Sequence, residues 1–246
     1  IRKRFYMLRD LIGFPSKKYN YKNNYSKGIY VEQVKVSSVY DFAKNFTNFE
    51  SFSECGEDRI IKYILNHYNK KFSEINYIDI GCHTPTYCNN TFLFYKNGSR
   101  GVIVEPNPVL APEIKKYRPK DIFLQLGINF NGKESGKYYS FKTYPGLNTF
   151  NEEDAKNVVD QGIDEIDKIE EIKLITPNEI LEKYFTNKNI DLVNIDVEGS
   201  EFEILSSIDF TKYKPFLFCI EINANKDKKY KYNENSPILD FMEKKG

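Results

Sequence analysis

Acidic side chains follow three apolar segments of the sequence, each at the point where the segment ends. Asp79 stands two residues before Gly81, Glu105 ends a second segment, and Asp196 and Glu198 follow a third. A carboxylate at the end of a second strand can accept hydrogen bonds from both hydroxyls of a ribose. Two acids as close as Asp196 and Glu198 can also accept a proton from a substrate hydroxyl. The pattern indicates a site that binds a nucleoside and accepts a proton from a substrate.

Apolar segments of strand length alternate with segments of helical periodicity along most of the chain. Strands are predicted over residues 77–80, 101–105, 122–126, 192–197 and 216–222. Helices are predicted over residues 39–49, 89–97, 177–185, 201–207 and 238–244, with two more beginning near residue 57 and after Pro106. The alternation predicts an α/β fold, an open, twisted, mostly parallel Rossmann-like sheet with helices on both faces. Because parallel strands share one direction, the acids would meet at one edge of that sheet.

Residues 127–175 interrupt this alternation. The Asn131-Gly132 and Ser135-Gly136 pairs beside an aromatic segment predict a β-hairpin within residues 127–144, and residues 144–172 are the least regular of the chain. We predict that residues 127–175 are an insertion on the substrate side of a domain spanning 51–246. Residues 1–50 are predicted to form a basic, tyrosine-rich N-terminal extension that includes the 39–49 helix.

The charge of the chain is unevenly distributed. Residues 1–30 carry eight Lys or Arg and one Asp, whereas the 246-residue chain has a net charge of +1. This segment is either a solvated arm or a surface for an anionic substrate, a nucleotide-sugar or peripheral membrane contact. No apolar run is long enough to span a bilayer, and no nucleic-acid-binding motif is present.

Cysteine and histidine are few and lack metal-binding spacing. The four cysteines include no CxxC pair, and the histidines are His67 and His83 alone. We therefore expect no zinc site and a reducing, cytoplasmic setting. The sequence begins at Ile1 rather than Met, which suggests a fragment of a longer chain.

The loop after the first predicted strand distinguishes between cofactors that carry an adenosine. A dinucleotide pyrophosphate needs close backbone approach and a loop with three glycines, but here Gly81 is followed by Cys82, His83, Thr84 and Pro85. Pro85 also lacks an N–H group that a phosphate could use. S-adenosylmethionine has no phosphate, and its charged amino-acid end and sulfonium favour nearby carboxylates. The loop favours S-adenosylmethionine over NAD or FAD.

Several ordered blocks of the sequence resemble the FkbM-type methyltransferases of the class I, Rossmann-like superfamily. They are residues 53–58, 77–83, 90–95, 101–108, 194–201 and 219–221, of which Asn-Ile-Asp-Val-Glu-Gly at 194–199 is the most specific. The family commonly has glutamine where this chain has Glu54. Class I methyltransferases also usually finish with an antiparallel strand pair, which we expect to be absent from this chain.

The resemblance implies O-methylation that depends on S-adenosylmethionine, commonly of a sugar, nucleotide-sugar or glycan hydroxyl. The predicted cofactor-binding residues are Glu57, Asp79, Gly81, Cys82, Asn90, Thr91, Glu105, Asn107 and Asp196. The predicted substrate-binding residues are Asn148, Glu198, Glu201 and Glu221. The candidates for a general base are His83, Asp196 and Glu198, since the acceptor hydroxyl must lose a proton.

Three alternatives remain open at this level. Asp196 and Glu198 could serve only to cap the helix that follows. Asp196, Glu221 and Asn223 could supply oxygen ligands to a divalent metal, although none is expected. The chain could instead be an NAD-dependent sugar oxidoreductase or epimerase, or a non-catalytic nucleotide-binding module of a glycan-assembly complex. The oligomeric state is not predicted.

Overall fold

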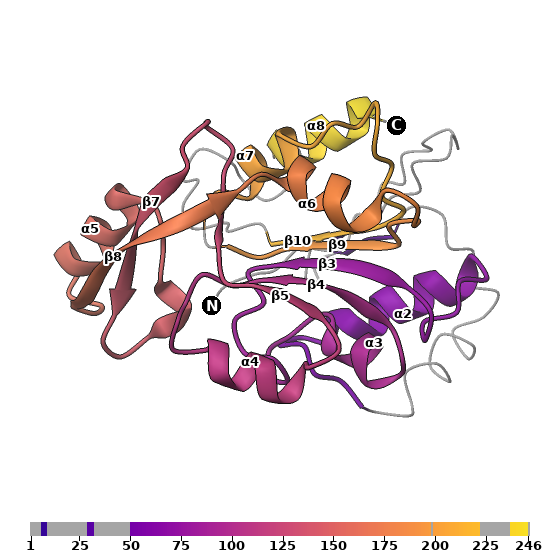
Figure 1. The fold of residues 1–246 in the computed structure, drawn as a ribbon, viewed down its shortest axis with the longest axis horizontal. Helices are drawn as coiled ribbons and strands as arrows, with labels where there is room; N and C mark the ends of the chain where they lie inside the picture. Colours follow the sequence, from indigo (N-terminus) through magenta and orange to yellow (C-terminus); the bar gives the residue numbers. More distant parts are fainter. Residues whose placement is uncertain (1–5, 9–28, 32–49, 198, 222–236, 246) are drawn as a thin grey trace, which may run out of the picture.

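The centre of the fold is a five-stranded parallel sheet (Figure 1). The computed structural model describes residues 6–8, 29–31, 50–197, 199–221 and 237–245. The sheet has the order β10-β9-β3-β4-β5. Its strands are β3 (Asn76–Ile80), β4 (Arg100–Val104), β5 (Ile122–Leu124), β9 (Leu192–Ile195) and β10 (Phe218–Ile220). The chain moves outward from β3 to β5 and then returns to β9 on the other side of β3. This order confirms the predicted Rossmann-like fold and makes the β3–β9 junction its topological switch point.

Helices cover both faces of the sheet (Figure 1). One face carries α2 (Glu57–His67), α3 (Phe92–Lys96) and α4 (Ala111–Tyr117). The other carries α6 (Pro177–Phe185), α7 (Glu201–Ser206) and α8 (Pro237–Lys245). Thr176 and Glu179 form a capping box at the start of α6.

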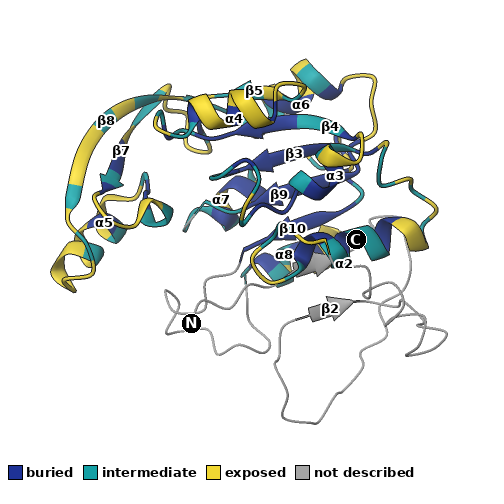
Figure 2. Ribbon diagram, turned by 90° about the horizontal axis from the view of Figure 1, so that it is seen from below, coloured by how far each residue is buried: buried dark blue, intermediate teal, exposed yellow. Residues whose placement is uncertain are grey.

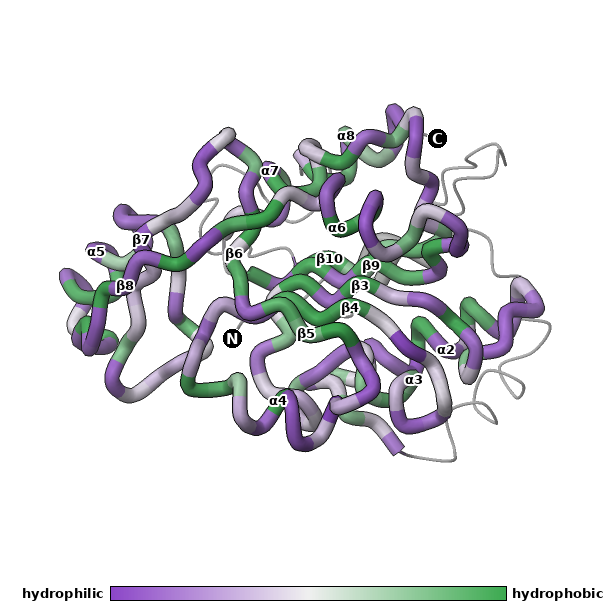
Figure 3. Tube along the Cα trace, viewed as in Figure 1, coloured by the Kyte–Doolittle hydropathy of each residue, from purple (hydrophilic) through white to green (hydrophobic). Residues whose placement is uncertain are grey.

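The alternation of side chains along β3 assigns each residue to one face. Ile78 and Ile80 pack in the core beneath α6, α7 and α8, whereas Tyr77 packs with α2 and α3. Because side chains alternate along a strand, Asp79 lies on the same face as Tyr77. Strands β3, β4, β9 and β10 are mostly buried and hydrophobic in Figures 2 and 3, as a parallel sheet covered on both sides requires, whereas the edge strand β5 is partly exposed.

Residues 127–175, the predicted insertion, have a fold that differs from the predicted hairpin. They contain β6 (Gly127–Ile128), β7 (Ser135–Phe141), the short helix η1 (Pro145–Leu147), α5 (Glu152–Asp160) and β8 (Ile166–Ile175). β7 pairs antiparallel with β8, and β6 pairs parallel with β8, so no hairpin forms within residues 127–144. The predicted hairpin was wrong because β8, the strand that pairs with β7, lies mostly within residues 144–172, which the sequence indicated to be irregular. Its charged residues are mostly exposed, which hides the strand pattern (Figure 2).

The remaining described strands lie near the other edge of the sheet. β1 (Tyr6–Leu8) and β2 (Ile29–Val31) pair in parallel, and β1 lies beside β10. No antiparallel strand joins the five-stranded sheet within the described residues. The predicted 39–49 helix lies outside them. No described helix has the length and apolar character needed to cross a membrane.

Candidate functional site

Gly81 joins the ends of three strands. Its backbone N–H donates to Val104 O at 2.9 Å, and the N–H of Asp196 donates to Ile80 O at 2.9 Å. Gly81 has a φ of +81°, and a Cβ at this position would lie 1.9 Å from Asp196 O. Only glycine fits, because any side chain would collide with backbone. The turn therefore brings the loop after β3 against the loop after β9.

Glu105 lies directly after β4 and is 4% exposed. Its carboxylate accepts hydrogen bonds from the backbone N–H groups of His83, at 2.8 Å, and Asn107, at 2.9 Å. Burial raises the pKa of Glu105 to about 7 against the effect of these two donors, and the charges of Asp79 and Asp196 raise it further. The three predicted acids therefore lie close enough to interact.

The backbone conformations of His83 and Asn107 are stabilised by hydrogen bonds at this edge of the sheet. His83 has a φ of +50°, in the left-handed region that non-glycine residues seldom adopt. Its N–H bond to Glu105 helps to hold it there. Asn107 accepts a hydrogen bond from the N–H of Val109 at 3.0 Å, which shapes the loop after β4.

Asp79 is fully buried, and its oxygens accept hydrogen bonds from three side chains. The hydroxyl of Thr91 donates to Oδ2 at 2.5 Å, and Asn89 Nδ2 donates to the same oxygen at 3.3 Å. Asn194 Nδ2 of β9 donates to Oδ1 at 2.8 Å. Burial raises the pKa of Asp79, and the nearby Arg118 guanidinium and the three donors oppose that increase. Asp79 is thus the acceptor around which the loop is built.

Asn90 and Cys82 complete the loop. Asn90 is 4% exposed, and its Nδ2 donates to Asn194 Oδ1 at 3.0 Å. Within the described part of the chain, Asn90 Oδ1 is buried and has no hydrogen-bond partner. Cys82 is buried, and burial raises the pKa of its thiol. The backbone carbonyl of Cys82 accepts from Asn89 Nδ2 at 3.0 Å.

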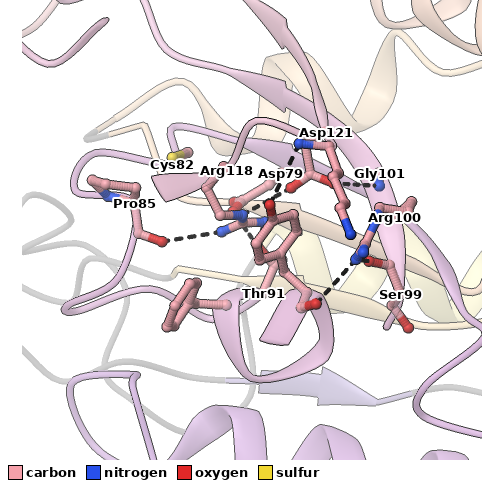
Figure 4. Close-up of polar contacts among 12 residues, drawn as sticks. Asp79, Cys82, Pro85, Thr91, Ser99, Arg100, Gly101, Arg118 and Asp121 are labelled. Carbon is pink, nitrogen blue, oxygen red and sulfur yellow. Dashed lines mark hydrogen bonds and ion pairs between the residues drawn. The ribbon is translucent and has the colours of Figure 1, made fainter. Parts of the chain in front are cut away.

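Arg118, which our reading of the sequence missed, supports the loop from the α4 side (Figure 4). It follows α4, is 1% exposed, and has an acceptor for every guanidinium N–H group. These acceptors are Asp121 Oδ2 (2.8 Å), Pro85 O (3.2 Å), Asn89 Oδ1 (3.2 Å), Tyr77 Oη (2.9 Å) and Thr91 Oγ1 (3.0 Å). The only signal in the sequence is an acid three residues after an arginine, which exposed ion pairs share.

The segment before α2 is tied to the same loop. Asn89 N–H donates to Phe52 O at 2.9 Å, and the Phe52 and Phe92 rings meet edge to face at 4.7 Å. Asp58 is buried and accepts hydrogen bonds from Ser51 Oγ and Phe52 N–H, both at 2.7 Å. Glu57 is also buried and accepts from Cys55 N–H at 2.7 Å. The two acids shape the turn that holds the loop.

The loop after β9 is organised by Glu201. Its buried carboxylate accepts hydrogen bonds from the N–H groups of Val197, at 3.2 Å, and Gly199, at 3.0 Å. Burial raises the pKa of Glu201, and the charge of Asp196 contributes. Glu198 lies outside the described residues, so neither its predicted role at the reaction centre nor the alternative of a helix cap can be compared with the structure.

Glu221 is buried directly after β10, and its N–H donates to Ile195 O at 3.0 Å. Asn223, the third residue of the alternative metal site, lies outside the described residues. Within the described ranges, no group of three or more His, Cys, Asp or Glu side chains could hold a metal ion.

A family model described as the methyltransferase FkbM domain matches residues 79–246. The chain belongs to the FkbM methyltransferase family. No curated protein and no solved structure matches it. The match begins at Asp79, so the 53–58 block lies before it, although the structure joins that block to the loop.

Tyr138, in the predicted insertion, is electrostatically coupled to Glu105. Burial raises the pKa of Tyr138, and the charge of Glu105 raises it further. Its ring contacts Phe150 at a centroid distance of 4.8 Å. Asn148 hydrogen-bonds Tyr138 and also accepts from Phe141 N–H at 2.9 Å. Asn148 thus supports the end of β7.

Proposed function

We propose that this FkbM methyltransferase uses S-adenosylmethionine to methylate a hydroxyl of a sugar, nucleotide-sugar or glycan. The observation that carries the cofactor assignment is Glu105, a buried carboxylate at the end of β4 and beside the switch point. In doubly wound sheets an acid at this position accepts hydrogen bonds from a ribose.

The residues at the site fit this cofactor. Each oxygen of Glu105 accepts one backbone hydrogen bond, and a carboxylate has about four acceptor sites, so it can still receive two ribose hydroxyls. Pro85 offers no N–H to a phosphate, and its carbonyl is bonded to Arg118. These features favour a nucleoside cofactor without a pyrophosphate.

The predicted cofactor residues other than Asp196 divide into two roles. We assign ligand contacts to Glu105, Gly81 and Asn90, which lie at the strand ends or keep an open acceptor. Asp79 and Thr91 are fully buried and bonded to each other, so we assign them the positioning of the loop. Cys82, Asn107 and Glu57 shape the surrounding turns through their hydrogen bonds.

S-adenosylmethionine, when bound, supplies a methyl group carried on a positively charged sulfur. The protein must hold the acceptor oxygen in line with that group and remove its proton, and orientation contributes much of the rate. Asp196 is our first candidate for the base, with Glu198 and His83 as the others. Asp196 is held against the turn at Gly81 by its backbone bond to Ile80.

For the acceptor, we propose that the insertion supplies the binding surface. The electrostatic effect of Glu105 on Tyr138, which is hydrogen-bonded to Asn148, supports this assignment. Glu201 acts by holding the loop after β9, since its carboxylate already binds the backbone there. Glu221 and Glu198 are the remaining candidates for contact with sugar hydroxyls, and the basic N-terminal segment for contact with an anionic acceptor or a membrane surface.

Titration calorimetry tests the cofactor assignment. We expect S-adenosylhomocysteine to bind with a measurable heat and NAD to give none. Binding of NAD alone would favour the oxidoreductase and overturn the proposal. A second assay measures transfer of labelled methyl to a panel of sugars, nucleotide-sugars and glycan extracts. Binding without transfer to any acceptor would favour a non-catalytic module.

Asp196→Asn is expected to lower the turnover number while leaving the affinity for S-adenosylhomocysteine unchanged. The amide retains the shape of the carboxylate but is a far weaker base. Turnover is measured at saturating cofactor, with Asp209→Asn, in the turn after α7, as a control that should retain activity. Loss of cofactor binding together with turnover would instead assign Asp196 to the cofactor.

A further inference from the structure

The two most exposed large apolar side chains of the described residues lie on the loops that follow β3 and β4. Tyr87 is 72% exposed and Val109, two residues before α4, is 79% exposed. Tyr117, the last residue of α4, is 45% exposed. Single exposed apolar residues are common on protein surfaces, so exposure alone assigns no role to them. Their meaning depends on whether they share one surface.

The loop after β3 lies along α4, which brings these side chains to one side of the molecule. Cys82 packs with Ile114 of α4, and Pro85 O accepts a hydrogen bond from Arg118 Nη1 at 3.2 Å, directly after the helix. Tyr87 follows Pro85 by two residues. The inner side of α4 is buried through Ile114, and its outer side faces solvent (Figure 2).

The outer side of α4 also carries lysines that have no carboxylate partner. Lys115 and Lys116 lie in the last turn of the helix, Lys120 follows it, and all three are exposed. None of the three forms an ion pair with another described residue. Glu113 is the only acid of α4. This surface is therefore basic as well as partly apolar.

Exposed apolar side chains among lysines are typical of proteins that bind at the surface of a membrane. Lysine ammonium groups are attracted to anionic headgroups while their alkyl chains lie along apolar surface. Tyrosine suits the same interface, because its ring is apolar and its hydroxyl stays in water. A nucleic acid or an acidic polysaccharide would engage the lysines but leave Val109 exposed to water. The apolar side chains therefore favour a bilayer over a polyanion.

We propose that this surface, the α4 face, binds a bilayer that contains anionic lipids. The α4 face consists of Tyr87, Val109, Lys115, Lys116, Tyr117 and Lys120. The inference goes beyond the proposed function, because it concerns where the chain acts and not which reaction it performs. Three charges and three short apolar contacts give reversible binding that weakens as salt increases. The basic residues 1–30 add to the attraction for anionic lipid.

Flotation of the full chain with lipid vesicles tests the proposal. We expect binding to phosphatidylcholine vesicles that contain about one-third phosphatidylserine, and none to phosphatidylcholine alone. One lysine near such a surface changes the partition coefficient by about fivefold, so Lys115→Gln, Lys116→Gln and Lys120→Gln together should weaken binding by roughly a hundredfold. Tyr87→Ser with Val109→Ser should weaken it by about tenfold, and this loss should persist in salt that screens the lysines.

The matched control replaces three exposed lysines in other parts of the chain, Lys183, Lys188 and Lys214, by glutamine. This control has the same net charge as the α4 lysine variant and should bind as the wild-type chain does. An equal loss in the control would show that net charge alone governs binding and would overturn the α4 face. Circular dichroism checks that each variant is folded.

Two other results would also overturn the proposal. One is the absence of vesicle binding by the wild-type chain. The other is binding that the lysine changes weaken but the Tyr87→Ser and Val109→Ser pair does not, with RNA or heparin displacing the vesicles. That result would assign the α4 face to an anionic polymer. Flotation involves no methyl transfer, so its outcome is independent of the proposed reaction.

Discussion

Replacing Arg118 with methionine is expected to lower the free energy of unfolding by about 3–5 kcal/mol. The guanidinium is 1% exposed, and its partner Asp121 is buried at a distance of 2.8 Å. Methionine fills similar volume but leaves the Asp121 carboxylate buried without its cation. It also removes the donors that hold Pro85, Asn89 and Thr91. Urea unfolding followed by circular dichroism measures the change.

The control for Arg118 is an ion pair of the same kind at the surface. Lys142 and Glu165 pair at 2.6 Å with both side chains largely exposed, so Lys142→Met should leave the unfolding midpoint unchanged. Adding Asp121→Asn to Arg118→Met should recover part of the lost stability, since the second change removes the unpaired charge. A loss below about 1 kcal/mol for Arg118→Met would show that the buried network contributes no more than a surface pair.

Replacing Glu105 with glutamine is expected to weaken the binding of S-adenosylhomocysteine by about tenfold to a hundredfold at pH 8. A carboxylate accepts hydrogen bonds from ribose hydroxyls more strongly than an amide does, and glutamine resembles the protonated acid in shape. Calorimetric titration measures the change, with Glu113→Gln on the exposed face of α4 as the matched control. Unchanged affinity in Glu105→Gln would remove this residue from the cofactor site.

The pH dependence of binding gives a second measure of Glu105. Burial raises its pKa to about 7, so the carboxylate is largely protonated at pH 6 and largely ionised at pH 8. If the ionised form binds the ribose, affinity in the wild-type chain should increase by about tenfold between these values. The Glu105→Gln variant should lose this dependence. An identical profile in both would assign the titration to another group.

The raised pKa of Glu105 also affects the free energy of unfolding in the absence of ligand. This free energy should decrease with rising pH, whereas the affinity for the cofactor should increase. The folded chain binds more protons than the unfolded chain between the ordinary carboxyl pKa of 4.5 and about 7, so stability decreases as the pH rises through this interval. Asp79 and Glu201, whose pKa values are also raised, contribute to this decrease. The difference in slope between wild type and Glu105→Gln isolates the share of Glu105.

The sequence by itself determined the fold class and the acids at the sheet edge. Parallel strands buried on both faces have short apolar runs, and their shared direction brings Asp79, Glu105 and Asp196 to one edge whatever the loops do. The sharp turn at Gly81, two residues after Asp79, could also be predicted from the sequence. These features depend on local patterns, which a single segment contains in full. The family match to residues 79–246 confirms the resemblance to the FkbM methyltransferases.

Only the tertiary structure decided how the acids are used. Asp79 faces the α2–α4 side of the sheet and is enclosed by residues from 10 to 115 positions away in the chain, so its role in holding the loop depends on long-range packing. Arg118 and Asn194 join the site for the same reason. β7 likewise pairs with β8, a strand that follows α5 in the chain, and no turn residue in the sequence specifies this pairing. Spacing along the chain predicts which residues reach the edge, whereas hydrogen-bond direction and burial decide which atoms remain open to a ligand.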